Sequence, residues 1–386
     1  MKKLQIFIPL LFTISAVLGQ ENIKYYKFRT EIEESVRDQI FTALDSLFVQ
    51  LTNDILYEKY LSSELKDLTF SVLSDIQKYE QGKDSIQKSK IDKHLIRGYP
   101  IEKNKFFLSI AFIRDNNEKA PVIYYILNLL ANLENDAFYF SSPLLYYTRK
   151  WEQTKVGQIT YHHKGKLNLD RARIFDEKNT TIAKKMGVQS EEFDFYMCEN
   201  YQEILRLLGV EYSVYENSKY RTGYGVDSNT IFSIMNHEDF SHDIFHYYSG
   251  KINKRDNRNW ITEEGIAYLW GNAYYTDSKG KMITHQQLVD ELKSYLQENP
   301  DKSLFDLFEN NTKIFNHIAP EISVRSTISG IIANQVEKEK GMEGVSKLIN
   351  AGSKDRLGSY LKKVDELIGI DKNNFNTKVK ELIDKY

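Results

Sequence analysis

The alternation of apolar and polar positions changes along the chain. From residue 24 to about residue 84, apolar residues such as Ile40, Leu44 and Leu47 recur three or four positions apart with charged residues between them, which predicts amphipathic helices. Between residues 106 and 169 this period is lost. Aromatic, β-branched and other apolar residues crowd together there, in the stretches FFLSIAFI, PVIYYILNLL, AFYFSSPLLYYT and TKVGQITYHHKGKLNL. These stretches predict strands, or one group of strands with a short helix.

The second half of the chain has a helical pattern. Residues 194–213 predict a strand, a loop and a short helix that ends at Gly209. After Ser228 the three- and four-residue spacing returns and continues to the last residue. It predicts helices at residues 231–248, 260–275, 284–297, 303–317, 326–340, 342–351, 356–368 and 374–386. The sequence therefore predicts an α+β fold in which a mixed half precedes a helical half.

Residues 1–19 have the pattern of a secretory signal peptide. Two lysines precede an apolar run, and the small residues Val17 and Gly19 stand three and one positions before the expected cut. The run is shorter than the roughly 20 residues that a spanning helix needs, and no second run of that kind follows. We therefore expect export to the periplasm or the extracellular space, without a membrane span. The single cysteine, Cys198, lies far from the cut, so a lipoprotein is not expected.

Three regions are expected after this leader. They are a helical region at 20–100, a mixed region with a β-sheet at 101–228 and a helical domain at 229–386. The chain carries 52 Lys and Arg against 54 Asp and Glu and has no basic block. This charge pattern does not predict nucleic-acid binding. One cysteine cannot form an internal disulfide, so stability is expected to come from the core or from a metal.

Three of the eight histidines fall within ten residues, at His237, His242 and His246. At about 100° per residue of a helix, His242 and His246 share one face with Glu238. His237 falls with the apolar residues on the opposite face. It is therefore expected at a helix start or in the packing, outside any site.

Glu238, His242 and His246 follow one another at i, i+4 spacing on the predicted helix. The outer two lie about 12 Å apart and cannot share one ion, so His242 can bind a metal with either neighbour, which gives two registers. In the first register His242 and His246 bind the metal. Asp243 then stands where H-E-x-x-H places the glutamate that acts as general base on a zinc-bound water. In the second register Glu238 and His242 bind the metal and Asp239 is the base. Catalytic zinc most often takes imidazole nitrogens, which favours the first register.

A third ligand on a second helix would complete an open zinc site. The segment NWITEEGIAYLWGN follows the histidines, with an apolar face that includes Trp260. Here the chain resembles the gluzincin metallopeptidases, especially the peptidase MA-like group, whose H-E-x-x-H helix is followed by a W-x-x-E-G-x-A segment. The matching residues are W-I-T-E-E-G-I-A. The resemblance implies that Glu264, next to Gly265, is the last zinc ligand, and that Glu263 faces away or orients a histidine.

The resemblance extends from about residue 190 to the C-terminus and implies a gluzincin-like helical half. Together with the export expected from residues 1–19, it implies a secreted zinc metallopeptidase that hydrolyses peptide bonds of a peptide or protein substrate with a metal-activated water. The chain departs from the family because it has no intact H-E-x-x-H. The Asp243 carboxylate would sit roughly 1.5 Å behind that of a glutamate, and a misplacement of about 1 Å can cost on the order of 100-fold in rate.

Two other functions therefore stay open at this point. One is a catalytically inactive metallopeptidase-like binding protein that retains a metal. The other is an unrelated secreted α+β protein with an accidental histidine cluster. An oxyanion-stabilising residue is not selected by the sequence, although His317 and Tyr275 lie downstream.

Overall fold

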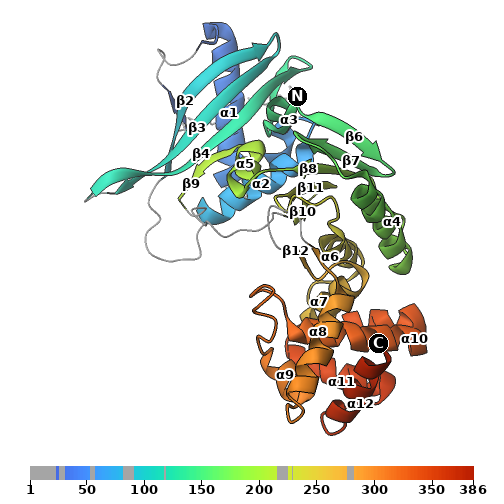
Figure 1. Cartoon of the computed structure of the whole chain (residues 1–386). Coiled ribbons are helices and arrows are strands. Elements are labelled where there is room, and N and C mark those ends of the chain that lie inside the picture. Colours follow the sequence, from blue (N-terminus) through green and yellow to red (C-terminus); the bar gives the residue numbers. More distant parts are fainter. Residues whose placement is uncertain are drawn as a thin grey trace, which may run out of the picture. The chain divides into compact units, whose positions relative to one another are not determined.

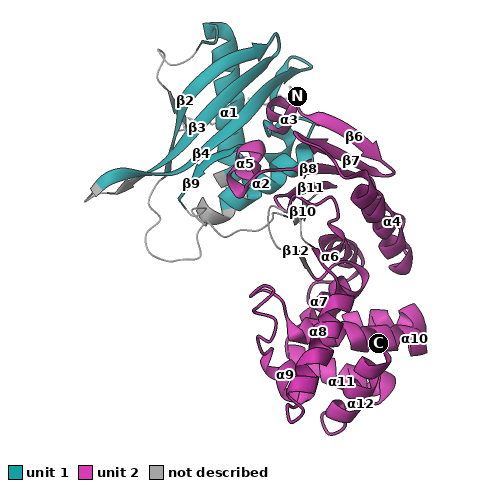
Figure 2. Cartoon of the chain, viewed as in Figure 1, with its two compact units in different colours: residues 1–143, 209–217 teal, residues 144–208, 218–386 magenta. Residues whose placement is uncertain are grey.

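The computed structural model describes residues 23–25, 31–52, 57–80, 91–116, 119–214, 225–227, 229–275 and 282–386. The expected signal peptide lies outside these residues. The chain forms two compact units (Figure 2). Unit 1 comprises Met1–Pro143 and Gly209–Asn217, and unit 2 comprises Leu144–Leu208 and Ser218–Tyr386. Helices and β-sheets are both abundant, and the predicted α+β class is confirmed.

Unit 1 is a twisted sheet with helices packed against it (Figure 1). The strand order is β1 (Ile23–Tyr25), β2 (Ile91–Glu102), β3 (Lys105–Asn116), β4 (Lys119–Glu134) and β5 (Ala137–Ser141), and β9 (Val210–Ser213) also pairs with β4. The helical elements are α1 (Glu34–Thr52), η2 (Tyr57–Tyr60) and α2 (Lys66–Glu80). Phe48 of α1 meets Phe112 of β3 edge to face at 5.6 Å between ring centroids, which joins helix and sheet in one core.

Unit 2 begins with a mixed sheet in the order β10 (Gly225–Asp227), β11 (Thr230–Ser233), β8 (Phe193–Met197), β7 (Ile159–His163) and β6 (Glu152–Val156). The three inner strands are parallel and the two outer pairs are antiparallel. Helix α4 (Leu169–Lys185) connects the parallel strands β7 and β8, as a parallel pair requires. The short helices α3 (Leu144–Thr148) and α5 (Tyr201–Leu208) complete this part.

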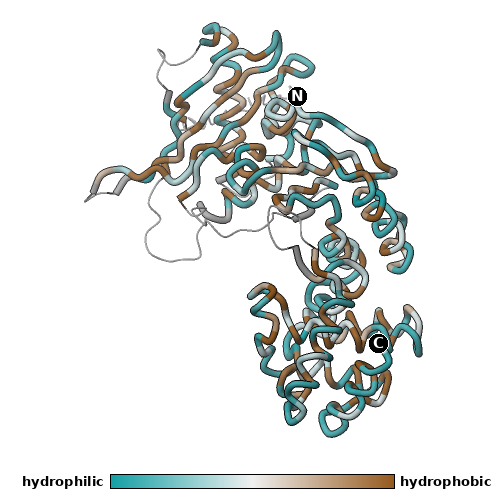
Figure 3. The backbone as a smooth tube through the Cα atoms, viewed as in Figure 1, coloured by the Kyte–Doolittle hydropathy of each residue, from teal (hydrophilic) through white to brown (hydrophobic). Residues whose placement is uncertain are grey.

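The rest of unit 2 is helical apart from a small hairpin of β12 (Tyr274–Tyr275) and β13 (Met282–Ile283). The helices are α6 (Ser241–Ile252), α7 (Trp260–Trp270), α8 (His285–Glu298), α9 (Leu304–Asn310), α10 (Val324–Ile349), α11 (Arg356–Ile368) and α12 (Phe375–Lys385). Apolar and polar colours alternate along these helices in Figure 3, as expected when one face is buried. Within the described residues, we find no helix with the length and apolar character needed to span a membrane.

The units do not coincide with the boundaries predicted at residues 100 and 228. Strand β2 runs through residue 100, and the same sheet packs against α1, so the described part of residues 20–100 shares a core with the strands that follow. Strand β11 pairs with β8 and then leads into the helical region, so the second sheet belongs to the unit that contains the helices. Sequence patterns are local, whereas both pairings join segments far apart in the chain.

Three predicted helices are wrong at one end, and one of them, predicted at 303–317, ends at Asn310. Residues 231–233 belong to β11, and α6 begins only at Ser241. The predicted helix at 260–275 ends at Trp270, and residues 274–275 form β12. A short apolar run fits a buried strand as well as a helix, which explains the error at 231–233. In contrast, α11 has the predicted bounds, and α10 joins two predicted helices across a break at Gly341.

Helix α7 lies very close to α10. A Cβ added at Gly265 of α7 would come within 2.5 Å of the Ser329 side-chain oxygen and 2.8 Å of the Gly330 nitrogen. The Ser329 hydroxyl donates a hydrogen bond to the Ile261 carbonyl (2.9 Å). At this distance only glycine leaves the two backbones room to pack.

We expect Gly265→Ala to lower the free energy of unfolding by about 1–3 kcal/mol, because the new methyl group must displace α10. Urea unfolding followed by circular dichroism measures this loss. Gly165→Ala is the matched control, because an added Cβ there meets nothing within 4 Å. Equal unfolding free energies for the two variants would contradict the prediction.

His285, the first residue of α8, is buried between α10 and the C-terminus. Its Nε2 lies 2.9 Å from the Thr327 carbonyl, so this nitrogen donates, and Nδ1 then accepts from the Tyr386 hydroxyl at 2.7 Å. Burial lowers the pKa of His285 to about 4. The imidazole is therefore neutral in the folded protein at pH values where it is protonated in the unfolded chain.

We expect this group to make stability depend on pH between about 4 and 6.5. In that window the unfolded state binds more protons, so stability rises with pH and is lost on acidification, by about 3 kcal/mol in total. Denaturant unfolding of wild type and His285→Gln across the window measures the difference. The exposed substitution His317→Gln is the control, and identical pH profiles for all three proteins would overturn the prediction.

Candidate metal centre

Helix α6 places two histidines on one face. The loop before it is held by side chains, since the Asp239 carboxylate accepts a hydrogen bond from the Ser241 amide (2.9 Å) at the start of the helix. Ile244, Phe245 and Tyr248 of α6 are buried. His242 and His246 lie one turn apart and are each about one fifth exposed, at 18% and 19% of their side chains. They share a face because of their i, i+4 spacing.

Helix α7 brings a carboxylate to this face. Its start is capped by Asn259, whose side-chain oxygen accepts from the Ile261 amide (3.1 Å) while its amide group donates to the carbonyls of Gly352 and Arg356. Capping and the close contact with α10 fix where α7 lies. Glu264, in the first half of this helix, is 18% exposed at its side chain.

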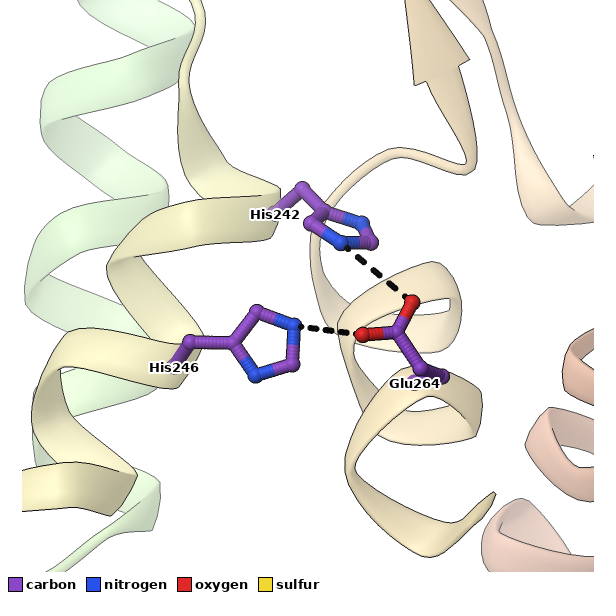
Figure 4. Close-up of side chains that lie close together, drawn as sticks. All are labelled: His242, His246 and Glu264. Carbon is purple, nitrogen blue, oxygen red and sulfur yellow. Dashed lines mark ion pairs between the residues drawn. The ribbon is translucent and has the colours of Figure 1, made fainter. Parts of the chain in front are cut away.

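The side chains of His242, His246 and Glu264 point toward one another from the two helices (Figure 4). The His246 Nε2 atom lies 3.1 Å from Glu264 Oε1, and the His242 Nε2 atom lies 3.7 Å from Glu264 Oε2. One ligand atom from each residue lies within 4.8 Å of the others, and no other cluster of this kind occurs in the described part of the chain. Ligands about 2.0–2.1 Å from a tetrahedral zinc ion are roughly 3.4 Å apart, so small movements suffice to close this site on an ion.

The hydrogen bonds around the histidines fit a metal. His242 Nδ1 lies 2.9 Å from the Asn272 carbonyl, to which it can only donate, so the Nε2 lone pair faces Glu264. Metal-binding histidines are usually oriented by such a bond. His246 Nδ1 is buried and makes no hydrogen bond to a described residue, whereas Nε2 faces Glu264 Oε1 at 3.1 Å. The Nε2 atoms of both histidines are thus turned toward one carboxylate, as they would be around a shared metal ion.

The surroundings of His246 and Glu264 shift the ionisation of these two groups. Burial alone lowers the pKa of His246, but the neighbouring carboxylates, chiefly Glu264, outweigh burial and raise it above its ordinary value. Burial raises the pKa of Glu264, yet the two imidazoles outweigh this effect and hold the pKa below its ordinary value. Glu264 is therefore a charged carboxylate beside two imidazoles, which is the donor set of a His₂Glu zinc site.

Asp243 lies beside the cluster on α6. Its side chain is half-buried, and burial raises its pKa, with Glu264 adding to this rise and both histidines opposing it. Asp243 therefore belongs to the same electrostatic environment as the three clustered residues, in the position that H-E-x-x-H gives to the general base.

Aromatic rings enclose the histidines. His246 stacks on Trp260 at 5.5 Å between centroids with an angle of 9°, and His242 lies 5.8 Å from the Tyr268 ring. Trp260 is 51% exposed, so it does not anchor α7 in the core as the sequence suggested. Trp260 and Glu264 have i, i+4 spacing on α7, which places the indole on the face that carries the ligand.

The residues of the second register lie apart from the cluster. Glu238 and Asp239 precede α6, so the helical spacing predicted between Glu238 and His242 does not apply. Glu238 accepts a hydrogen bond from the Asn168 amide (2.7 Å), and Asp239 pairs with Lys178 at 2.9 Å. The structure therefore brings together the ligands of the first register only.

Other candidates also lie outside the cluster. Glu263 is 1% exposed, accepts from the Ser249 hydroxyl and pairs with Arg258 at 3.3 Å, so it does not join its neighbour Glu264. His237 is buried and its Nδ1 accepts from the Asp239 amide (2.9 Å). His317 is exposed and 3.4 Å from Glu291, and the side chain of Tyr275 lies outside the described residues.

Sequence reasoning missed the Asn272 carbonyl and the stacking of Trp260. The carbonyl carries no residue-type signal, because every residue has one. The position of Trp260 was readable from its i, i+4 spacing to Glu264.

Comparison with known proteins adds no family assignment. No family model matches the sequence, and no curated protein matches it.

Proposed function

We propose that His242, His246 and Glu264 bind a zinc ion and that the protein is an exported, gluzincin-like metallopeptidase. The observation that carries the proposal is the convergence of the three ligand atoms from α6 and α7, with the His242 Nε2 lone pair directed at the cluster by the Asn272 carbonyl. The resemblance of W-I-T-E-E-G-I-A to the family segment supports the assignment of Glu264. The substrate class is a peptide or protein.

Three protein ligands leave one coordination position for a water molecule or a substrate oxygen. Bound zinc supplies Lewis-acid activation of a water molecule and of the substrate carbonyl. The chain supplies the rest. Asp243 is the general base that takes up a proton, and it stands next to a ligand on the same helix. Trp260 covers one face of His246 and excludes water from it.

A second function is favoured by the identity of residue 243. Aspartate is one methylene shorter than the glutamate of H-E-x-x-H, and a displacement of about 1 Å can lower a rate on the order of 100-fold. A metal-retaining binding protein without peptidase activity is therefore the alternative. The two functions share the metal site and differ in whether the base reaches the reacting water.

We expect the purified protein to hold about one equivalent of zinc by elemental analysis after dialysis against metal-free buffer. His242→Ala and Glu264→Ala should each lose it, because two remaining ligands bind weakly. His317→Ala is the matched control on an exposed histidine and should retain the metal. Stoichiometric zinc in both ligand variants, with circular dichroism spectra like that of wild type, would contradict the ligand assignment.

Peptidase activity is tested with a peptide library and zinc-loaded protein. We expect wild type to cleave, and Asp243→Asn to lose activity by about 100-fold or more while retaining zinc, because an amide cannot act as the base. Asp243→Glu restores H-E-x-x-H and should cleave at least as fast as wild type. Failure of zinc-loaded wild type to cleave any library member would reject the peptidase and leave the binding function.

A further inference from the structure

A buried polar network lies behind the metal-binding face of α6. It joins three segments that are distant in sequence: Lys178 of α4, Asp239 of the loop before α6, and Asn272 of the turn after α7. Asp239 and Asn272 are each 1% exposed, and the Lys178 side chain is 25% exposed. The network therefore connects the two ligand-bearing helices to α4, which belongs to the sheet part of unit 2.

Every part of the network has a direct partner. Asp239 Oδ2 accepts from Lys178 Nζ (2.9 Å) and from Asn272 Nδ2 (2.7 Å), while Oδ1 accepts from the Ser241 amide at the start of α6. Lys178 also donates to Asn272 Oδ1 (3.1 Å) and to the Gly271 carbonyl (3.3 Å). A buried carboxylate needs such compensation, since one without a partner is strongly unfavourable.

The network ends on a metal ligand. The backbone carbonyl of Asn272 accepts the hydrogen bond from His242 Nδ1 at 2.9 Å. The turn that carries this carbonyl packs closely against α6, because a Cβ added at Gly271 would lie 2.7 Å from the backbone nitrogen of His242. The position of the carbonyl therefore depends on the Asn272 side chain and on the Lys178 and Asp239 groups that hold it.

We propose that Lys178, Asp239 and Asn272 are positioning residues, which keep His242 in the tautomer with the proton on Nδ1 and so present Nε2 to the metal. This inference rests on the proposed zinc site. Their effect reaches the cluster through the Asn272 backbone carbonyl, which bonds to His242 Nδ1. Loss of such an outer hydrogen bond typically lowers metal affinity 10- to 100-fold.

Asn272→Ala in the full-length protein tests the proposal with two measurements. Competition with a chromophoric chelator gives the zinc dissociation constant, which should rise about 10- to 100-fold. Nitrogen-15 NMR of metal-free protein, at a pH well above the usual histidine pKa of about 6.5, reports the His242 tautomer. Wild type should show the proton on Nδ1, and Asn272→Ala should show a shift of population toward Nε2.

Asn179→Ala is the matched control. Asn179 follows Lys178 on α4, is fully buried, and its side chain bonds to Gln158, Glu191 and Tyr248 but not to the network. This variant should lose stability without changing the His242 tautomer or the zinc dissociation constant. If Asn272→Ala does not fold, Lys178→Gln is the second test, because it removes the hydrogen bonds from Lys178 to Asn272 Oδ1 and to the Gly271 carbonyl. It should raise the zinc dissociation constant and shift the His242 proton toward Nε2, and Lys178→Arg should restore both wild-type values.

An unchanged His242 tautomer and an unchanged zinc dissociation constant in folded Asn272→Ala or Lys178→Gln would overturn the inference. Equal changes in Asn179→Ala would also overturn it, because they would show a general effect of lost stability. Failure of wild type to bind zinc would reject the proposed function instead. The tautomer measurement on metal-free protein still decides the positioning role in that case.

Discussion

The distance between α7 and its neighbours is the constraint on which the candidate site depends. Gly265 allows α7 to approach α10, and Gly271 allows the end of α7 to approach the start of α6. Glycine is needed at both contacts because a methyl group would overlap backbone atoms. With α7 held on two sides, Glu264 meets the two histidines of α6.

This packing also determines the charges in the cluster. Glu264 is mostly buried, where a lone carboxylate would favour its neutral form, yet the adjacent imidazoles hold it ionised. His246 is mostly buried, and its Nε2 faces Glu264 Oε1 at 3.1 Å. A dication at the centre would satisfy all three groups together. The proposed zinc site would therefore account for two imidazoles that converge on one carboxylate.

The proposed function rests on two kinds of support with different scope. The geometry of the three ligand atoms concerns metal binding, and the W-I-T-E-E-G-I-A resemblance concerns peptide hydrolysis. Asp243 bears on hydrolysis alone, because a shorter general base affects the rate of the reaction and not the binding of the ion. The polar network of Lys178, Asp239 and Asn272 concerns metal binding, since it is proposed to orient the imidazole of His242.

The sequence by itself determined the α+β class and most of the C-terminal helices, and it named His242 and His246 within one of two open registers, with Glu264 implied by the resemblance. Those features follow from local spacing: three- and four-residue periodicity for α11 and α12, and the i, i+4 step from His242 to His246. The start of α6 was missed because the apolar run at 231–233 suits a strand that pairs with β8, a partner more than thirty residues away. Only the tertiary structure separated Glu238 from His242, and it did so by beginning the helix after both Glu238 and Asp239. It also joined Lys178, Asp239 and Asn272, because buried polar partners are selected by proximity in the folded chain, which no spacing along the sequence records.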